Sequence, residues 1–152
     1  MAYTNPGPAS STTQSTVAVV TPVNTNSNPV VQAANGYRLL AVAKGINANV
    51  VADTAMPVIN STSYSPLLII KVNASTSLTT AVGGVYTAAA AGGTAVLTPA
   101  ALSGNTGATV VVATAPTTTA VQTAQTLYWR ISTAQGGAAT VDVYVFGYDF
   151  SA

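Results

Sequence analysis

Short apolar and β-branched stretches, separated by turn residues, run through most of the chain. The segment SPLLIIKVNAS at 65–75 contains the continuous apolar run Leu67–Ile70, which is typical of a strand covered on both faces. The segments TLYWRIST at 126–133 and AATVDVYVFGYDF at 138–150 instead alternate between two kinds of side chain, as strands with two different faces do. These patterns predict β-strands rather than helices.

Other segments of the same kind follow one another at fairly regular spacing. We expect strands at 37–45, at 49–60 with Pro57 at an edge or bulge, and at 108–115, where Pro116 closes the strand. About eight to ten short strands with turns between them are the pattern of a sandwich or barrel. We therefore predict an all-β sandwich over residues 37–152, with the jelly roll as one candidate topology.

The segment SLTTAVGGVYTAAAAGGTAVLTP at 77–99 has the pattern of a β-hairpin. Its Gly83-Gly84 pair predicts a bulge, and its Gly92-Gly93 pair predicts the turn. The run TAAAAGG has helical propensity, but its short length and the flanking glycine pairs favour a turn. A short helical turn at 99–102 is also compatible with the sequence.

Residues 1–36 are uncharged and rich in Thr, Ser, Asn and Pro. Their prolines block helices and leave any strand at an edge, whereas the apolar segment TVAVVTPV at 16–23 favours a strand. Two interpretations stay open: an extended N-terminal arm that docks on a neighbouring molecule, and a disordered tail. In the first interpretation, the valines make the contact: Val17, Val19, Val20, Val23, Val30 and Val31.

The last two segments are expected to pair as a final hairpin, and the length of the loop decides which side chains share a face. An odd loop places the core side chains together, namely Leu127, Trp129, Ile131, Val141, Val143 and Val145. The opposite face then carries Tyr128, Arg130, Asp142, Tyr144, Phe146 and Tyr148. An even loop would place Trp129 with Asp142, Tyr144 and Phe146, and the valines with Tyr128 and Arg130. The odd loop separates the side chains better, so we favour it.

Neither face of this predicted hairpin is polar enough to be simply solvated. One face is core, and the other is either a contact between subunits or a second core layer. Tyr, Trp, Phe and Arg are enriched at interface hot spots, so we favour the subunit contact. The candidate subunit interface is therefore the second of the two sets, Tyr128, Arg130, Asp142, Tyr144, Phe146 and Tyr148.

Charge changes this picture, because only 5% of the residues are charged, against about 25% in ordinary domains. The net charge of +1 offers no electrostatic footprint for nucleic acid or anionic lipid. No apolar run approaches the roughly 20 residues of a membrane-spanning helix, and the segment MAYTNPGPAS does not have the pattern of a secretory signal. We expect no nucleic-acid partner and no membrane partner.

Enzymatic chemistry is poorly supplied. Without His or Glu, general-base catalysis would fall to three Asp and two Lys, and no catalytic motif surrounds them. Lys71 is expected to reach outward from the end of its buried run. The chain has no Cys for metal sites or disulfides, and its glycine pairs lack the spacing of phosphate loops. We expect no enzyme activity, no metal and no cofactor.

The segments PLLIIKVNASTSLTTAVGGVYTAAAAGG and TAQTLYWRISTAQGGAATVDVYVFGYDF resemble parts of small structural proteins of tailed bacteriophages. The resemblance covers about 65–150 and is carried by phrases such as DVYVFGYDF. It implies a head cement or decoration protein that bridges major capsid protein subunits with extended arms and forms a trimer or a dimer, and of these we expect a homotrimer. It also implies a place on the capsid surface of the virion, after synthesis in the cytoplasm of the bacterial host.

Two alternatives remain open at this point. One is a phage tail, fibre or head–tail connector component. The other is a secreted β-sandwich adhesin or carbohydrate-binding module, because aromatic strands that also carry Asn and Asp do bind sugars. No functional residue is transferred by the resemblance, since its signature is structural rather than catalytic.

Overall fold

The computed structural model describes residues 36–73, 77–105 and 110–151. The candidate valines of the predicted arm lie outside these residues. The described residues contain eight strands, β1 (Tyr37–Asn47), β2 (Ala52–Pro57), β3 (Tyr64–Asn73), β4 (Val82–Ala88), β5 (Gly92–Ala101), β6 (Val111–Thr114), β7 (Thr126–Thr133) and β8 (Thr140–Asp149). In this part of the chain, no helix has the length and apolar character needed to cross a membrane.

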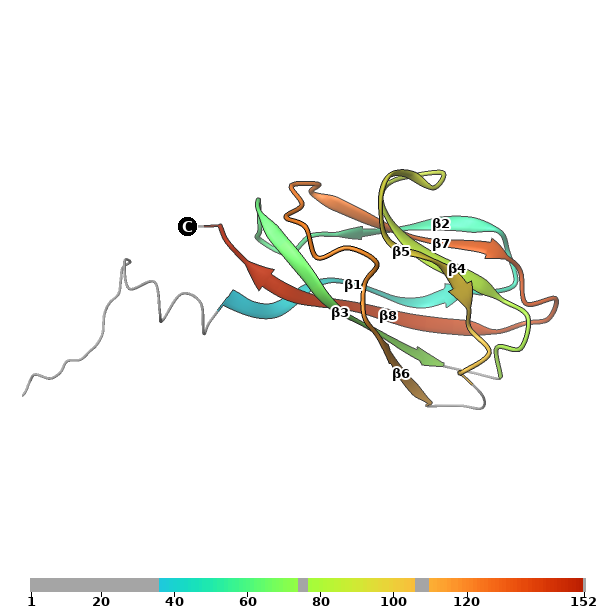
Figure 1. Ribbon diagram of the computed structural model, residues 1–152. Coiled ribbons are helices and arrows are strands. Elements are labelled where there is room, and N and C mark those ends of the chain that lie inside the picture. The colour runs from blue at the N-terminus through green and yellow to red at the C-terminus, as the bar shows by residue number, and fades with distance from the viewer. Residues whose placement is uncertain (1–35, 74–76, 106–109, 152) are drawn as a thin grey trace, which may run out of the picture. The chain divides into compact units, whose positions relative to one another are not determined.

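The strands form two four-stranded sheets, ordered β1-β8-β3-β6 and β2-β7-β4-β5, which pack against each other as the two layers of a sandwich (Figure 1). The predicted all-β sandwich is confirmed. The pairing is nested, because β1 lies beside β8, β2 beside β7, β3 beside β6 and β4 beside β5. A long antiparallel ribbon that folds over on itself produces this order, which is the topology of a jelly roll.

The nested order separates the last two strands. β7 lies in one sheet and β8 in the other, so the predicted final hairpin was wrong. The separation of side chains was right, since the core set of both strands is almost fully buried, namely Leu127, Trp129, Ile131, Val141, Val143 and Val145. These side chains line the core from opposite sheets, because the loop at 134–139 carries the chain across the sandwich.

The predicted hairpin at 77–99 is confirmed as β4 and β5, with register shifts after Gly83. Its turn is closed by the Gly92 N–H, which donates to the Ala89 carbonyl at 3.0 Å. The two residues between them, Ala90 and Ala91, have φ values of 59° and 62°, a region that side chains with a Cβ rarely adopt. The suggested helical turn at 99–102 was wrong, because β5 continues through Ala101.

Gly83 lies where β4 passes over the only tryptophan of the chain. A Cβ atom built on Gly83 would lie 2.4 Å from Cζ2 of Trp129, far inside van der Waals contact. The indole is fully buried and fills the space that a side chain at position 83 would occupy. Position 83 must therefore be a glycine. The glycine pair that the sequence marks as a bulge thus also makes room for the largest side chain of the core.

β3 runs through the centre of its sheet, between β8 and β6. Ile69 faces the core and is fully buried, whereas Leu68 and Ile70 are only half-buried, so coverage on both faces is incomplete within this chain. Lys71 follows the two-residue period of Ile69 to the inner side and is 4% exposed. The prediction that Lys71 reaches outward was therefore wrong, and burial lowers the pKa of its amine below the usual value of 10.5.

Candidate functional site

The outer surface of the β1-β8-β3-β6 sheet is apolar. On β8, Tyr144 and Phe146 are half-buried and alternate with the buried valines of the core. Tyr144 lies directly opposite Ile70 of β3, and Phe146 lies opposite Leu68. Because directly opposed residues of antiparallel strands share a face, these four side chains form two adjacent rows on the outside of the sheet.

The apolar surface extends from β3 onto the neighbouring short edge strand β6. Val72 lies opposite Val111 of β6, and the Val111 side chain is 61% exposed. Beyond Val72 in the other direction lies Asp142 of β8. We call the surface made by the apolar members of these rows the apolar outer face: Leu68, Ile70, Val72, Val111, Tyr144 and Phe146.

Two charged side chains border this face, and each has a contact within the chain. The amine of Lys44 lies 6.0 Å from the centroid of the Tyr144 ring, a distance at which a cation is attracted to the ring face. The Oδ1 atom of Asp142 accepts a hydrogen bond from the Gly45 N–H at 2.7 Å. The six side chains of the apolar outer face are uncharged, and the two charges at its border are contacted by an aromatic ring and a backbone N–H rather than by an opposite charge.

The candidate subunit interface is divided between the two sheets. Its β8 members lie on the β1-β8-β3-β6 sheet, whereas Tyr128 and Arg130 belong to β7 and lie on the outside of the other sheet. There Arg130 pairs with Asp53 of β2, with 3.0 Å between Nη1 and Oδ1. The expectation of one shared face was wrong, because it required β7 and β8 to be neighbours. The role of these residues in a subunit contact stays a prediction.

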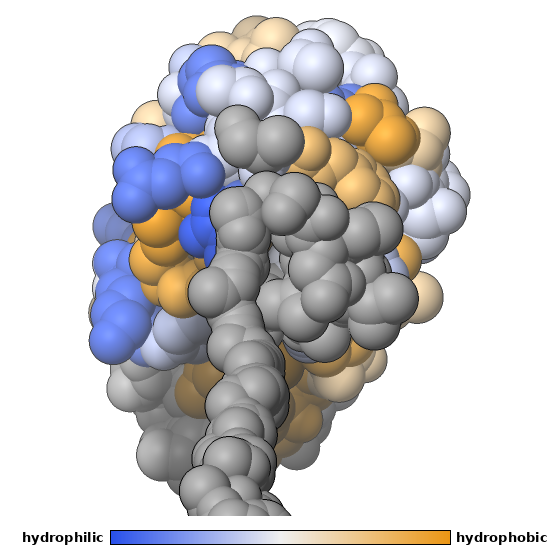
Figure 2. All heavy atoms as spheres, turned by 90° about the vertical axis from the view of Figure 1, so that its left-hand side faces the viewer, coloured by the Kyte–Doolittle hydropathy of each residue, from blue (hydrophilic) through white to orange (hydrophobic). Residues whose placement is uncertain are grey.

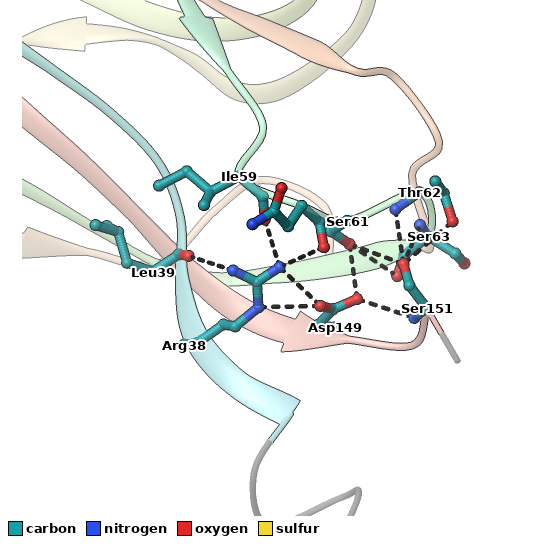
Figure 3. Close-up of polar contacts among 9 residues, drawn as sticks. Arg38, Leu39, Ile59, Ser61, Thr62, Ser63, Asp149 and Ser151 are labelled. Carbon is teal, nitrogen blue, oxygen red and sulfur yellow. Dashed lines mark hydrogen bonds and ion pairs between the residues drawn. The ribbon is translucent and has the colours of Figure 1, made fainter. Parts of the chain in front are cut away.

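A second polar site ties the beginning of β1 to the end of β8, and Figure 3 shows it in close-up. Nε and Nη2 of Arg38 donate to Oδ2 of Asp149 at 2.9 and 2.8 Å. The other carboxylate oxygen, Oδ1, accepts from the Ser61 hydroxyl at 2.7 Å and from the Ser151 N–H at 2.9 Å. We call Arg38, Ser61, Asp149 and Ser151 the terminal clasp.

The clasp also fixes the loop between β2 and β3. Nη2 of Arg38 donates to the carbonyl of Asn60 at 2.9 Å and to that of Ile59. The Ser151 hydroxyl accepts from the N–H groups of Thr62 at 2.6 Å and Ser63 at 3.2 Å. Three segments that are distant in sequence are therefore joined through one carboxylate and one guanidinium (Figure 3).

Opposing influences act on the pKa of Asp149. Burial favours the neutral acid, but hydrogen bonds from the Ser151 N–H, the Ser61 hydroxyl and the Arg38 guanidinium favour the carboxylate. The net result is a pKa below the usual value of 3.8. At neutral pH the clasp is therefore a charged pair in which both oxygens of the carboxylate accept hydrogen bonds.

The arrangement of the clasp suits a structural role better than a chemical one. The hydroxyl of Ser61 has the Asp149 carboxylate as its partner, but Arg38 already engages that carboxylate. Neither the carboxylate of Asp149 nor the guanidinium of Arg38 is a base matched to activate a hydroxyl near neutral pH. In the part of the chain that the structure describes, no group of three or more Asp, Glu, His or Cys side chains could hold a metal ion. The clasp therefore joins chain segments and offers no arrangement for catalysis.

Sequence reasoning did not find the clasp. Its only signal is the scarcity of charge, since a chain with three carboxylates and two arginines has few ways to pair them. The positions Arg38 and Asp149 are 111 residues apart, and nothing in the local pattern of either segment links them. The nested topology brings them together, and a strand pattern alone does not specify that topology.

The described surface contains apolar as well as polar side chains. Viewed from one end, strongly hydrophilic side chains gather along one side, and hydrophobic side chains reach the surface beside them (Figure 2). Large hydrophobic residues elsewhere are also exposed, including Val50, Val51, Val121 and Phe150. Scattered exposure of this kind is ordinary, whereas the ordered rows of the apolar outer face form a contiguous surface.

Comparison with known proteins adds no assignment. No family model matches the chain, and neither a curated protein nor a solved structure matches it. Function is therefore inferred from the residues and from the fold.

Proposed function

We propose that this protein is a non-enzymatic structural protein of a tailed-bacteriophage virion. In this role it is a head cement or decoration protein that binds the major capsid protein on the capsid surface and bridges its subunits. The resemblance of segment 65–150 to such proteins supports the proposal. A jelly-roll sandwich is also a fold that viral capsid domains use.

The observation that carries the proposal is the combination of a compact sandwich with a contiguous apolar outer face and very few charges. All three Asp side chains are engaged within the chain, Asp53 with Arg130, Asp142 with the Gly45 N–H and Asp149 with Arg38. Such a surface is suited to binding by buried area rather than by electrostatic steering. On a lattice, many interfaces of about 1,600 Å² each would act together through multivalency.

The N-terminal segment 1–36 supplies the second part of the proposal. Its uncharged, valine-containing sequence suits the addition of an extended strand to a sheet edge of a neighbouring capsid subunit. Residues Arg38–Ser151 form a compact unit of their own. Deletion of 1–36 should therefore leave a folded sandwich that binds capsids much more weakly.

The copy number of the chain in purified virions tests the proposed function. Quantitative mass spectrometry would measure it relative to the major capsid protein. A ratio near one, or a simple fraction of one, is expected for a lattice-wide cement or decoration protein. A handful of copies would instead indicate a tail, fibre or connector component, and absence from the particles would overturn the virion role.

The deletion experiment needs a matched control. Removal of residues 1–15 shortens the segment but keeps every candidate valine of the arm, so this variant should still bind capsids. Removal of 1–36 should greatly weaken binding in co-sedimentation with capsids while the melting transition of the sandwich remains. Undiminished binding by the longer deletion would remove the arm from the proposal.

One observation favours the sugar-binding alternative. The rings of Tyr148 and Phe150 lie with centroids 6.4 Å apart, and their residues are 40% and 54% exposed. Exposed aromatic rings are suitable platforms for sugar rings, and lectins also use jelly rolls. A glycan that binds the wild type but not a Tyr148→Ala, Phe150→Ala variant would support this alternative over the virion role.

A further inference from the structure

The apolar outer face consists of two unlike stripes that lie side by side. β8 contributes the aromatic side chains Tyr144 and Phe146, and β3 contributes the aliphatic side chains Leu68, Ile70 and Val72. The two strands are direct neighbours in the middle of their sheet. The register aligns the stripes residue by residue, with Tyr144 beside Ile70 and Phe146 beside Leu68.

The aromatic stripe of one copy can pack against the aliphatic stripe of a second copy, and the reverse. A two-fold axis that runs between β3 and β8, parallel to both strands, places the aromatic stripe of one copy over the aliphatic stripe of the other. In such an isologous contact each pairing occurs twice, so Tyr144 of each copy would cover Ile70 of the other. The strands of the two copies would be aligned, which is a common geometry for packed sheets.

The distribution of charge around the face also favours a second copy of this chain as the partner. Lys44 and Asp142, at its border, already have contacts with Tyr144 and Gly45. A partner that placed a charge over the centre of the face would bury that charge against uncharged side chains, and the charge would lose hydration without compensation. A second copy of this chain presents the same uncharged centre and keeps its charges at the border, so the centre of the contact buries no charge.

We propose that the apolar outer face is a two-fold contact between two copies of this chain. A two-fold isologous contact closes at two copies, so the proposal departs from the homotrimer that we expected from the sequence. It concerns the purified protein in solution, and with this face buried between two copies, capsid binding in the virion role falls to the N-terminal segment and to surfaces outside the face. A dimer that is absent from virions would keep this proposal and overturn the virion role, and a monomeric protein found on virions would do the reverse.

A charge-exchange experiment tests both the surface and its symmetry. Ile70→Lys buries an unpaired amine in both halves of the contact, and Tyr144→Asp buries an unpaired carboxylate in both halves. Each full-length variant alone should be monomeric by sedimentation equilibrium at concentrations where the wild type is dimeric. An equimolar mixture should form a heterodimer, because the two-fold axis places the introduced amine of one variant over the introduced carboxylate of the other.

A control variant and a milder variant make the test decisive. Ala55→Lys introduces the same charge at an exposed position of β2, in the other sheet, and should leave the dimer intact. Val111→Lys, at the exposed edge strand β6, cannot disturb the core and should weaken the dimer at least tenfold in Kd. Circular dichroism melts would identify any variant that fails to fold.

The following results would overturn the proposal. One is a wild type that stays monomeric up to millimolar concentration. Another is a trimer, whose contacts do not follow a two-fold axis. A dimer that survives both Ile70→Lys and Val111→Lys in folded form would show that another surface makes the contact. A mixture of folded Ile70→Lys and Tyr144→Asp variants that stays monomeric would exclude the proposed pairing.

Discussion

The guanidinium of Arg38 and the carboxylate of Asp149 meet through two hydrogen bonds, although the two residues are 111 positions apart. Arg38 lies near the start of β1 and Asp149 at the end of β8. Their contact therefore joins the first and the last strand, which are neighbours in the sheet. The Arg38 and Asp149 side chains are 29% and 14% exposed. Because both side chains are partly buried, solvent screens this ion pair less than it screens a fully exposed one.

Replacement of the clasp carboxylate should destabilise the fold. Asp149→Asn keeps the shape of the side chain but removes the charge that accepts hydrogen bonds from Arg38, Ser61 and Ser151. We expect a loss of roughly 1–3 kcal/mol in the free energy of unfolding, measured by urea denaturation. Asp53→Asn, in the other ion pair, removes fewer contacts and should cost less. An equal loss in both variants would argue against a special role of the clasp.

The same carboxylate should make stability dependent on acid pH. The pKa of Asp149 is lower in the folded protein than its ordinary value of 3.8, so the folded state binds this proton less readily than the unfolded state does. The resulting stabilisation is present above about pH 4 and is lost as the pH falls through the lowered folded pKa. Unfolding measured between pH 2 and 7 should show a smaller acid loss in Asp149→Asn than in the wild type. If the stability of both proteins fell equally with decreasing pH, the acid loss could not be assigned to Asp149.

Removal of the charge on Lys71 should stabilise the protein. Lys71 is 4% exposed, and all three carboxylates of the chain are engaged with other groups. Lys71→Met keeps most of the volume, and we expect a gain of about 1–3 kcal/mol at neutral pH. Because burial lowers the folded pKa of Lys71 below 10.5, the gain should shrink as the pH rises toward 10.5. Lys44→Met, on the exposed part of β1, is the control and should change little.

A methyl group on Gly83 should displace the indole of Trp129. The added Cβ would lie 2.4 Å from Cζ2, and overpacking of a core typically costs about 1–3 kcal/mol. Trp129 is the only tryptophan, so a red shift of its fluorescence in folded Gly83→Ala would report its movement directly. Gly137→Ala is the control, since nothing lies within 4 Å of its added Cβ. An unchanged spectrum and melting curve for Gly83→Ala would show that β4 can move away.

The hairpin turn between β4 and β5 should gain stability from glycine. Ala91 has a φ of 62°, which costs about 1–2 kcal/mol for a residue with a Cβ, although glycine loses more backbone entropy on folding. Ala91→Gly should therefore raise the free energy of unfolding by roughly 0.5–1 kcal/mol. Ala89→Gly, just before the strained pair, should bring no gain. A loss in Ala91→Gly would mean that backbone entropy outweighs the strain.

The sequence predicted local structure well where apolar side chains recurred at every second residue. The alternation around Trp129 and around Val143 correctly separated core from surface side chains, because a two-residue period specifies faces. It could not specify neighbours, since the same alternation fits a hairpin and a pair of strands in opposite sheets. The predicted final hairpin failed for this reason, and with it the single face expected for Tyr128 and Tyr144.

Lys71 shows the limit of an argument from residue type. The expectation of an outward lysine rested on its place at the end of a buried run and on its long charged side chain. Strand periodicity instead places this position on the same side as Ile69, facing the core. The clasp shows another limit, because Arg38 and Asp149 are neighbours only in the nested topology. Both outcomes depend on which strands pair, and pairing between strands so distant in the sequence leaves no local pattern.

The nested pairing also determines the order in which the fold can form during synthesis. In the described sheets, β1 has only β8 as its hydrogen-bonded neighbour, so β1 cannot pair until β8 has left the ribosome. Only the β4–β5 hairpin joins strands of these sheets that are consecutive in the chain. Long-range pairing of this kind slows folding, and a nascent chain would expose the unpaired edge of β1 throughout elongation.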